Sequence, residues 1–208
     1  MIKKQKVIFY IDGFNFYFGL KSKKLIKYYW LDIVKFCNQF VRPHQELVEV
    51  NYFSAIPSNN TGKRDRQDLF LSANKQNPKF NLCLGKFLAK SIKCNSCQNL
   101  FTTYEEKQTD VFIATKMIRD CVLKKNDVSI LISADSDLIP PIDFIKEYNP
   151  LHKIIVYFPV NRFSFDLRQK ANSCIKLDAH SDKFEKSLLP EEIKLANGYI
   201  IKRPLKWK

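Results

Sequence analysis

Four aspartates occupy positions from which their carboxylates could meet. Asp12 directly follows the apolar run Val7–Ile11, and Asp135 and Asp137 follow a second apolar run over 128–133. Runs of this length and composition are typical of strands that are buried on both faces of a parallel sheet. Ligands of open α/β sheets bind beyond the carboxyl ends of the strands, so we expect these three acids at one edge of one sheet.

Asp110 is the fourth acid and lies near the start of a predicted helix over 106–123, from which it could point toward the same edge. Carboxylates a few ångström apart oppose their joint ionisation, and a hard divalent cation removes that conflict. Clustered carboxylate oxygens suit Mg²⁺ or Mn²⁺, which polarise a phosphodiester and activate the attacking water. A single Asp after a strand is more often a helix cap or a turn residue. The prediction therefore depends on the shared placement of Asp12, Asp135 and Asp137.

Two polar residues beside these acids have both a functional and a structural interpretation. Asn15 could contact phosphate or metal, or it could cap the next helix along the chain. Ser133 could contact nucleic acid or hydrogen-bond a carboxylate, or it could serve only as a small residue at the end of its strand.

The chain is strongly basic, with 35 Lys and Arg residues against 21 Asp and Glu residues and a formal net charge of +14. Such a charge favours nucleic acid as the partner over a merely solvated basic surface. Lys21, Lys23 and Lys24 follow the first aspartate closely, and they are candidates for phosphate contact. Lys107 is another candidate, although it could instead pair with a neighbouring glutamate.

The six cysteines form no tight disulfide framework, and the N-terminal apolar run is too short for a signal peptide, which together predict a cytoplasmic protein. No apolar run reaches the roughly 18 residues of a membrane span. Cys94 and Cys97 have the spacing of half a Zn²⁺ site, but no Cys or His follows closely. The pair could be a half-site completed by a distant residue or by another subunit of a homo-oligomer, a redox-active dithiol, or a structural turn.

The remaining pattern alternates strands with helices. The sequence predicts strands over 6–11, 47–55, 80–87, 128–133, 153–158 and 173–177, and helices over 30–41, 63–75, 106–123, 137–148 and 164–171. Residues 59–62 are turn-rich, and residues 88–104 form an insertion within a domain over 1–180, on which a basic tail over 181–208 packs. The predicted fold class is α/β, with a mostly parallel central sheet and helices on both faces.

Several motifs resemble the NYN family of PIN-like nucleases, in its bacterial branch of uncharacterised cytosolic members. The resemblance covers nearly the whole chain and keeps the order of the motifs: IDGFNFYFGL at 11–20, YFSA at 52–55, CNSC at 94–97, YEEKQTDVFIATKMIRD at 104–120, LISADSDLIPPI at 131–142, RFSFDL at 162–167, and Leu189-Pro190 with Arg203-Pro204 and Trp207 in the tail. The blocks EEKQTDV and SADSDLIP are specific in combination. Ala134 stands where the family often has glycine, a small change that should not block the site.

The resemblance implies a three-layer, PIN-like (Rossmann-like) fold and divalent-metal ribonuclease activity, with Asp12, Asp110, Asp135 and Asp137 as catalytic metal ligands and Asn15 beside them. Endonucleolytic cleavage of single-stranded or structured RNA is the expected reaction. Some PIN-like domains bind nucleic acid without cutting it, so a non-catalytic RNA-binding or regulatory module, or a toxin with an antitoxin partner, is the alternative. A phosphatase of the haloacid dehalogenase type would need a second Asp two residues after the first, where this chain has phenylalanine.

Overall fold

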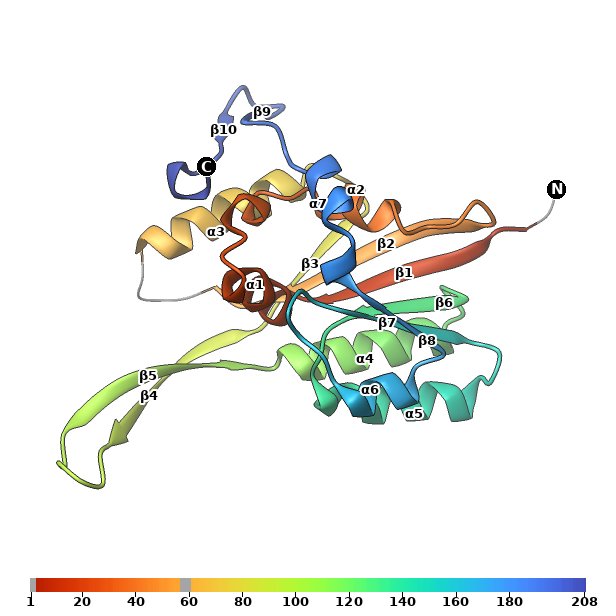
Figure 1. Ribbon diagram of the computed structural model, residues 1–208, viewed down its shortest axis with the longest axis horizontal. Helices are drawn as coiled ribbons and strands as arrows, with labels where there is room; N and C mark the ends of the chain where they lie inside the picture. The colour runs from red at the N-terminus through yellow and green to blue at the C-terminus, as the bar shows by residue number, and fades with distance from the viewer. Residues whose placement is uncertain (1–2, 57–60) are drawn as a thin grey trace.

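The computed structural model describes residues 3–56 and 61–208 and has three layers (Figure 1). Six strands form the central sheet in the order β3-β2-β1-β6-β7-β8, and every pairing between them is parallel. The strands are β1 (Gln5–Asp12), β2 (Gln45–Ser54), β3 (Phe80–Leu84), β6 (Val128–Ile132), β7 (Lys153–Phe158) and β8 (Ser173–Lys176). The chain runs outward in opposite directions from the adjacent strands β1 and β6, so the sheet has its topological switch point between them.

Helices cover both faces because the strands alternate their apolar side chains between two cores. Val7, Phe9 and Ile11 of β1 belong to one core, and Ile8 and Tyr10 belong to the other. The first face is covered by α1 (Gly13–Ser22), α2 (Ile33–Asn38), α3 (Thr61–Asn74) and α7 (Ser181–Lys186), and the second by α4 (Thr109–Val122), α5 (Ile139–Tyr148) and α6 (Phe165–Lys170) (Figure 1). Short 3₁₀ segments are η1 (Ile26–Tyr29), η2 (Ser136–Leu138), η3 (Leu177–Ala179) and η4 (Leu205–Trp207). The predicted α/β class is confirmed.

The predicted insertion over 88–104 is part of a longer antiparallel hairpin, β4 (Lys86–Lys93) and β5 (Leu100–Lys107), which projects away from the sheet (Figure 1). The strand predicted over 80–87 therefore ends at Leu84, and the helix predicted from 106 begins at Thr109. Gly85 lies between β3 and β4. A side chain does not fit at this position, because a Cβ would lie 2.6 Å from the carbonyl oxygen of Lys107. Local periodicity could not show this close approach of two backbone segments.

Two helices on the first face also differ from the sequence pattern. The helix predicted over 30–41 is shorter, because the Asp32 side chain accepts from the Lys35 N–H at 2.8 Å and caps α2 at its N-terminus. The helix α1 was not predicted, since its aromatic residues lie on several sides and obscure an amphipathic pattern. Of the predicted turn over 59–62, residues 59 and 60 lie outside the described residues, and 61 and 62 begin α3.

The C-terminal segment packs on the first face. Phe184 of α7 lies 4.5 Å from Phe36, measured between ring centroids, and the Trp30 indole N–H donates to the carbonyl of Pro190 at 2.8 Å. A two-stranded ribbon, β9 (Glu192–Lys194) and β10 (Ile200–Lys202), follows. A domain boundary near residue 180 stays a prediction. Within the described parts of the chain, no helix is both long and apolar enough to cross a bilayer.

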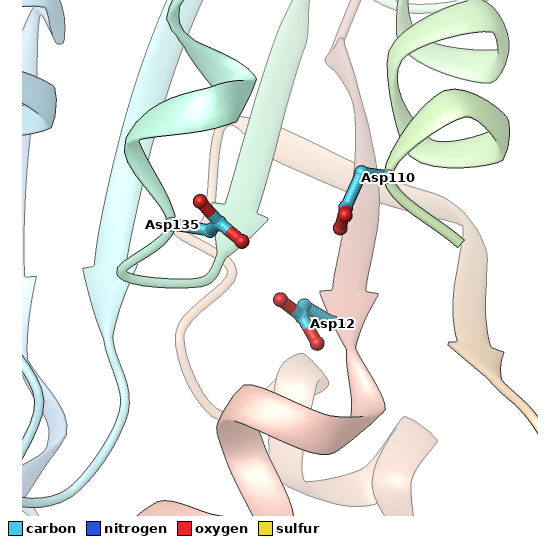
Figure 2. Close-up of side chains that lie close together, drawn as sticks. All are labelled: Asp12, Asp110 and Asp135. Atoms are coloured by element: carbon cyan, nitrogen blue, oxygen red, sulfur yellow. The ribbon is translucent and has the colours of Figure 1, made fainter. Parts of the chain in front are cut away.

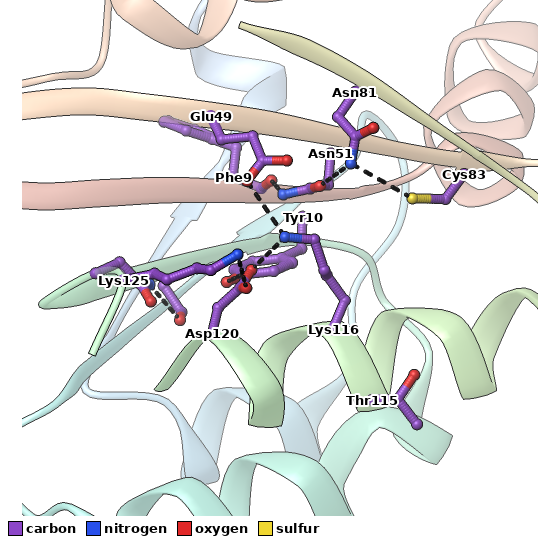
Figure 3. A network of polar contacts seen from close by, with 12 residues as sticks. Phe9, Tyr10, Glu49, Asn51, Asn81, Cys83, Thr115, Lys116, Asp120 and Lys125 are labelled. Carbon is purple, nitrogen blue, oxygen red and sulfur yellow. Dashed lines mark hydrogen bonds and ion pairs between the residues drawn. The ribbon is translucent and has the colours of Figure 1, made fainter. Parts of the chain in front are cut away.

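A buried polar network holds α4 against the sheet (Figure 3). Asp120 is fully buried and accepts from the Tyr10 hydroxyl at 3.0 Å and from the Lys116 ammonium at 2.7 Å. Lys116 also reaches Glu49 of β2 at 3.2 Å, and Lys125 lies 3.6 Å from the other oxygen of Asp120. These contacts fix the orientation of α4, whose first turn carries Asp110.

Candidate metal centre

Three of the four predicted aspartates converge. Asp12, Asp110 and Asp135 each offer one carboxylate oxygen, and these atoms all lie within 4.8 Å of one another (Figure 2). Asp12 ends β1, Asp135 follows β6, and Asp110 lies in the first turn of α4. The carboxylates therefore meet at the switch point of the sheet, the place where open α/β sheets bind their ligands. Asp137 lies outside this group, exposed in η2, and its N–H donates to Asp135 Oδ1 at 3.0 Å.

Asp12 is held rigidly. Its side chain is 3% exposed, and both of its carboxylate oxygens accept hydrogen bonds. The Asn15 N–H donates to Oδ1 at 3.0 Å, while the Asn15 amide and the Ser133 hydroxyl donate to Oδ2 at 2.6 and 2.9 Å. The residue that caps α1 is Asp12, whose side chain accepts from the Asn15 N–H, so Asn15 is not itself the capping residue. The expected hydrogen bond from Ser133 to a carboxylate is present, and contact of Asn15 or Ser133 with nucleic acid stays a prediction. The Asp135 N–H donates to the Ser133 hydroxyl at 3.1 Å, which links the turn after β6 to Asp12.

The cluster carries an electrostatic conflict. Burial raises the pKa of Asp12, and the charge of Asp135 raises it further, although the hydrogen bonds from Asn15 and Ser133 oppose that shift. Burial also raises the pKa of Asp110 to about 6, with added repulsion from Asp135, Asp12 and Asp137. An all-carboxylate set of oxygen donors in mutual repulsion fits a hard divalent cation such as Mg²⁺ or Mn²⁺.

Glu106 is a fifth acid beside the cluster, and the sequence pattern did not single it out. It lies near the end of β5, half-buried, and accepts a hydrogen bond from the Thr109 hydroxyl. Burial raises its pKa to about 7, and the charges of Asp12 and Asp110 contribute. The sequence pattern missed Glu106 because it predicted a helix from residue 106, and an acid in the first turn of a helix is ordinary. The left-handed backbone of Gln108, with φ 78°, is what redirects the chain between strand and helix.

The predicted phosphate-binding lysines have varied surroundings. Lys21 lies exposed near the end of α1 with its ammonium 5.4 Å from the centroid of the Phe18 ring. Lys23 and Lys24 are exposed in the turn that follows. The Lys107 ammonium lies 2.9 Å from a carboxylate oxygen of Glu105, the pairing that was the alternative for this residue. Nucleic-acid contact by these four lysines stays a prediction.

A cavity of about 520 Å³ lies beside the carboxylates, between α1, η1, β2, α3 and the base of the hairpin. Its wall includes Tyr17, Tyr29, Tyr52, Phe87 and Trp207, with Lys21 and Arg66 among its cations. Gly13, the residue after Asp12, also lines it. Tyr52 lines the cavity and is also close to the acidic cluster. Burial raises the pKa of Tyr52 strongly, and the charges of Asp12 and Glu106 raise it further.

Cys94 and Cys97 lie apart from this centre, in the turn of the hairpin. Among residues 3–56 and 61–208, the three aspartates are the one group of at least three ligand-type side chains that converges. The cysteine pair therefore gains no third ligand from the described part of its own chain.

The fold and its carboxylate cluster define a PIN-like α/β domain, in which acids from separate strand ends meet at the switch point. Residues 6–178 match the NYN domain, so the chain belongs to the NYN domain family, whose members are typically nucleases. A crystal structure of a protein of unknown function from Vibrio parahaemolyticus RIMD 2210633 is similar in fold, with a TM-score of 0.58 and 19% identity over 91% of this chain and 99% of that chain. None of the curated proteins matches the chain.

Proposed function

We propose that this protein is a divalent-metal-dependent ribonuclease, acting as an endonuclease, with its active site at the Asp12–Asp110–Asp135 cluster. The convergence of these three carboxylates at the switch point is the observation that carries the proposal. A bound Mg²⁺ or Mn²⁺ would polarise the scissile phosphodiester and lower the pKa of the attacking water. Membership of the NYN family supports the same class of reaction.

The protein side chains have distinct roles in this proposal. Asp12 is the fixed ligand, because the hydrogen bonds from Asn15 and Ser133 set the direction of its lone pairs. Asp110 and Asp135 are ligands from the two sides of that carboxylate. Asp137 lies at the exposed edge, where it adds negative charge and can accept a hydrogen bond from the incoming water.

Single-stranded RNA is the substrate that the surroundings favour. Proteins hold single strands by basic grooves that follow the backbone and by aromatic side chains on which bases stack. The cavity beside the cluster offers tyrosine and phenylalanine rings together with Lys21 and Arg66, and it begins at the residue after Asp12. A base seated there would place its neighbouring phosphate next to the carboxylates. The net charge of +14 favours the approach of any polyanion.

The six cysteines are all free thiols, which agrees with the reducing conditions of the cytoplasm and with a site in contact with cellular RNA.

The test is cleavage of end-labelled single-stranded RNA with Mn²⁺, with Mg²⁺ and with EDTA. Asp12→Asn and Asp135→Asn should abolish metal-dependent cleavage while leaving the folded state intact by circular dichroism. Asp65→Asn is the matched control, since Asp65 is an exposed aspartate on α3 outside the cluster. If the wild type binds RNA and leaves it intact with every metal, the catalytic proposal fails and a non-catalytic RNA-binding module takes its place.

A further inference from the structure

The turn of the hairpin β4–β5 is a closed loop that presents two thiols. The Cys94 N–H donates to the carbonyl of Asn99 at 2.9 Å, and the Gln98 N–H donates to the carbonyl of Cys94 at 2.8 Å. Gln98 adopts a left-handed backbone with φ 61°. Cys94 is partly exposed and Cys97 is exposed, at the far end of an arm that leaves the body of the protein (Figure 1). Both thiols are therefore open to a ligand or a partner.

The geometry of the loop holds the two thiols together. The backbone of Cys94 is tied at its N–H to Asn99 and at its carbonyl to Gln98, so the chain turns back on itself within residues 94–99. Cys94 and Cys97, with two residues between them in this turn, have the spacing at which both side chains can bind one Zn²⁺ ion as thiolates.

The number of ligands decides what completes the site. A structural Zn²⁺ site is tetrahedral and closed, with four protein ligands, and two cysteines at this spacing supply half of them. Within the described residues no third Cys, His, Asp or Glu converges on the pair. The missing two ligands must therefore come from another molecule, and a second copy of the same loop supplies two thiolates by two-fold symmetry.

We propose that Cys94 and Cys97 from two copies of this chain bind one Zn²⁺ ion between the tips of their hairpins, so that zinc links the protein into a dimer. One Zn²⁺ with four thiolates carries a net charge of −2, and Lys93, directly before Cys94, is exposed and contributes one positive charge from each copy. The rest of the loop, residues 94–99, carries no lysine, arginine or acid. The tips can therefore approach each other despite the large positive charge of the whole chain.

Apolar side chains beside the loop add a surface for the second copy. Leu100 is 74% exposed and Phe101 is 47% exposed, on the two faces of the first residues of β5. Exposed apolar side chains of this size next to a metal half-site are suited to burial in a contact between two hairpin ends.

The test uses the full-length protein, purified under reducing conditions and supplied with zinc alone. Native mass spectrometry and elemental analysis should give a dimer with one zinc for two chains, which returns to monomer when a chelator is added. Cys94→Ser and Cys97→Ser should each give a zinc-free monomer. Cys174→Ser, at a partly buried cysteine of β8, is the matched control and should leave the zinc content and the dimer unchanged.

Two further measurements separate this site from the carboxylates. The same measurements on Asp12→Asn, in which the acidic cluster is weakened, should return the same ratio of one zinc for two chains. Co²⁺ in place of zinc should give sulfur-to-metal absorption bands, which carboxylate ligands do not produce. One zinc per chain in a monomer, a dimer that persists in Cys94→Ser, an intrachain disulfide under these conditions, or no zinc at all would each overturn the proposal, and none of these outcomes bears on the nuclease.

Discussion

Replacing Asp110 by asparagine should stabilise the metal-free protein. The folded state raises the pKa of Asp110 from 3.8 to about 6. The folded protein therefore binds the Asp110 proton more tightly than the unfolded chain does. The free energy of unfolding falls as the pH rises from about 3.8 to about 6, and the whole of this loss in stability is present above that range. Asp110→Asn keeps the shape of the side chain and removes the charge.

The expected magnitude follows from the size of the pKa shift. A shift of about two units corresponds to about 3 kcal/mol at 1.36 kcal/mol per unit. Because the Asp110 side chain is exposed, solvent screens the repulsion, and we reduce the expected gain to about 1 kcal/mol. For a protein of this size that gain should raise the melting temperature by about 2–4 °C.

The assay is thermal unfolding in EDTA at pH 8 and at pH 5. Asp110→Asn should melt above the wild type at pH 8. About half of the gain should remain at pH 5, because there the wild-type carboxyl is largely protonated in the folded protein but largely ionised in the unfolded chain, so folding must take up a proton. Asp65→Asn should stay within about 0.5 kcal/mol of the wild type at both values. Addition of Mn²⁺ at about a hundredfold above its Kd should stabilise the wild type by about 2.7 kcal/mol and reverse the order, if the variant has lost the ion. A variant that is less stable than the wild type at pH 8 in EDTA would refute the account of the cluster as mutually repelling acids.

Three other predictions concern neighbouring residues. The affinity for Mn²⁺ should rise with pH through the range from about 6 to about 7, because Asp110 and Glu106 must lose their protons first; Glu106→Gln should end that rise nearer pH 6, as titration calorimetry at a series of pH values can show. Tyr17→Ala should raise KM for single-stranded RNA about tenfold with kcat nearly unchanged, since stacking of one base contributes about 1–3 kcal/mol; an equal loss in kcat would count against a base-binding cavity. Asp120→Ala should lower the free energy of unfolding by about 3 kcal/mol in urea titrations, because it leaves the Lys116 ammonium partly buried without its nearest carboxylate; a loss below about 1 kcal/mol would show that the network of Figure 3 contributes little.

The sequence could predict the centre of the fold because the two strands that carry the acids are buried on both faces. Val7–Ile11 is a continuous apolar run and Val128–Ile132 is apolar apart from Ser129, and a polar residue at the end of such a run has to lie at the edge of the sheet. The adjacency of β1 and β6, which brings Asp12 and Asp135 together, is a property of the sheet order and came only with the structure.

What local pattern could not predict depends on contacts between distant segments. The cavity wall combines Tyr17 with Trp207, residues near opposite ends of the chain, and no periodicity relates them. Glu106 was hidden because strand and helix meet within two residues, at a left-handed Gln108 whose side-chain type does not demand that conformation. The cysteine spacing indicated half a metal site, but only the hairpin showed that the pair stands at an exposed tip.

The strand β5 connects the two sites proposed for this chain. It begins at Leu100, beside the cysteine loop, and near its other end carries Glu106, beside Asp12 and Asp110. Eight residues of strand span on the order of 25 Å, so a zinc ion at the tips would hold the two carboxylate clusters on the order of 50 Å apart. Phe87 of β4 stacks on Phe14 of α1, with 6.0 Å between ring centroids, so the base of each arm is tied to the wall of the cavity.

Loss of zinc should therefore separate the subunits while leaving each carboxylate cluster assembled. Cleavage of short RNA by Cys97→Ser should accordingly match that of the wild type, whereas RNA long enough to reach both clusters should bind the variant more weakly, because only the dimer can hold it at two points.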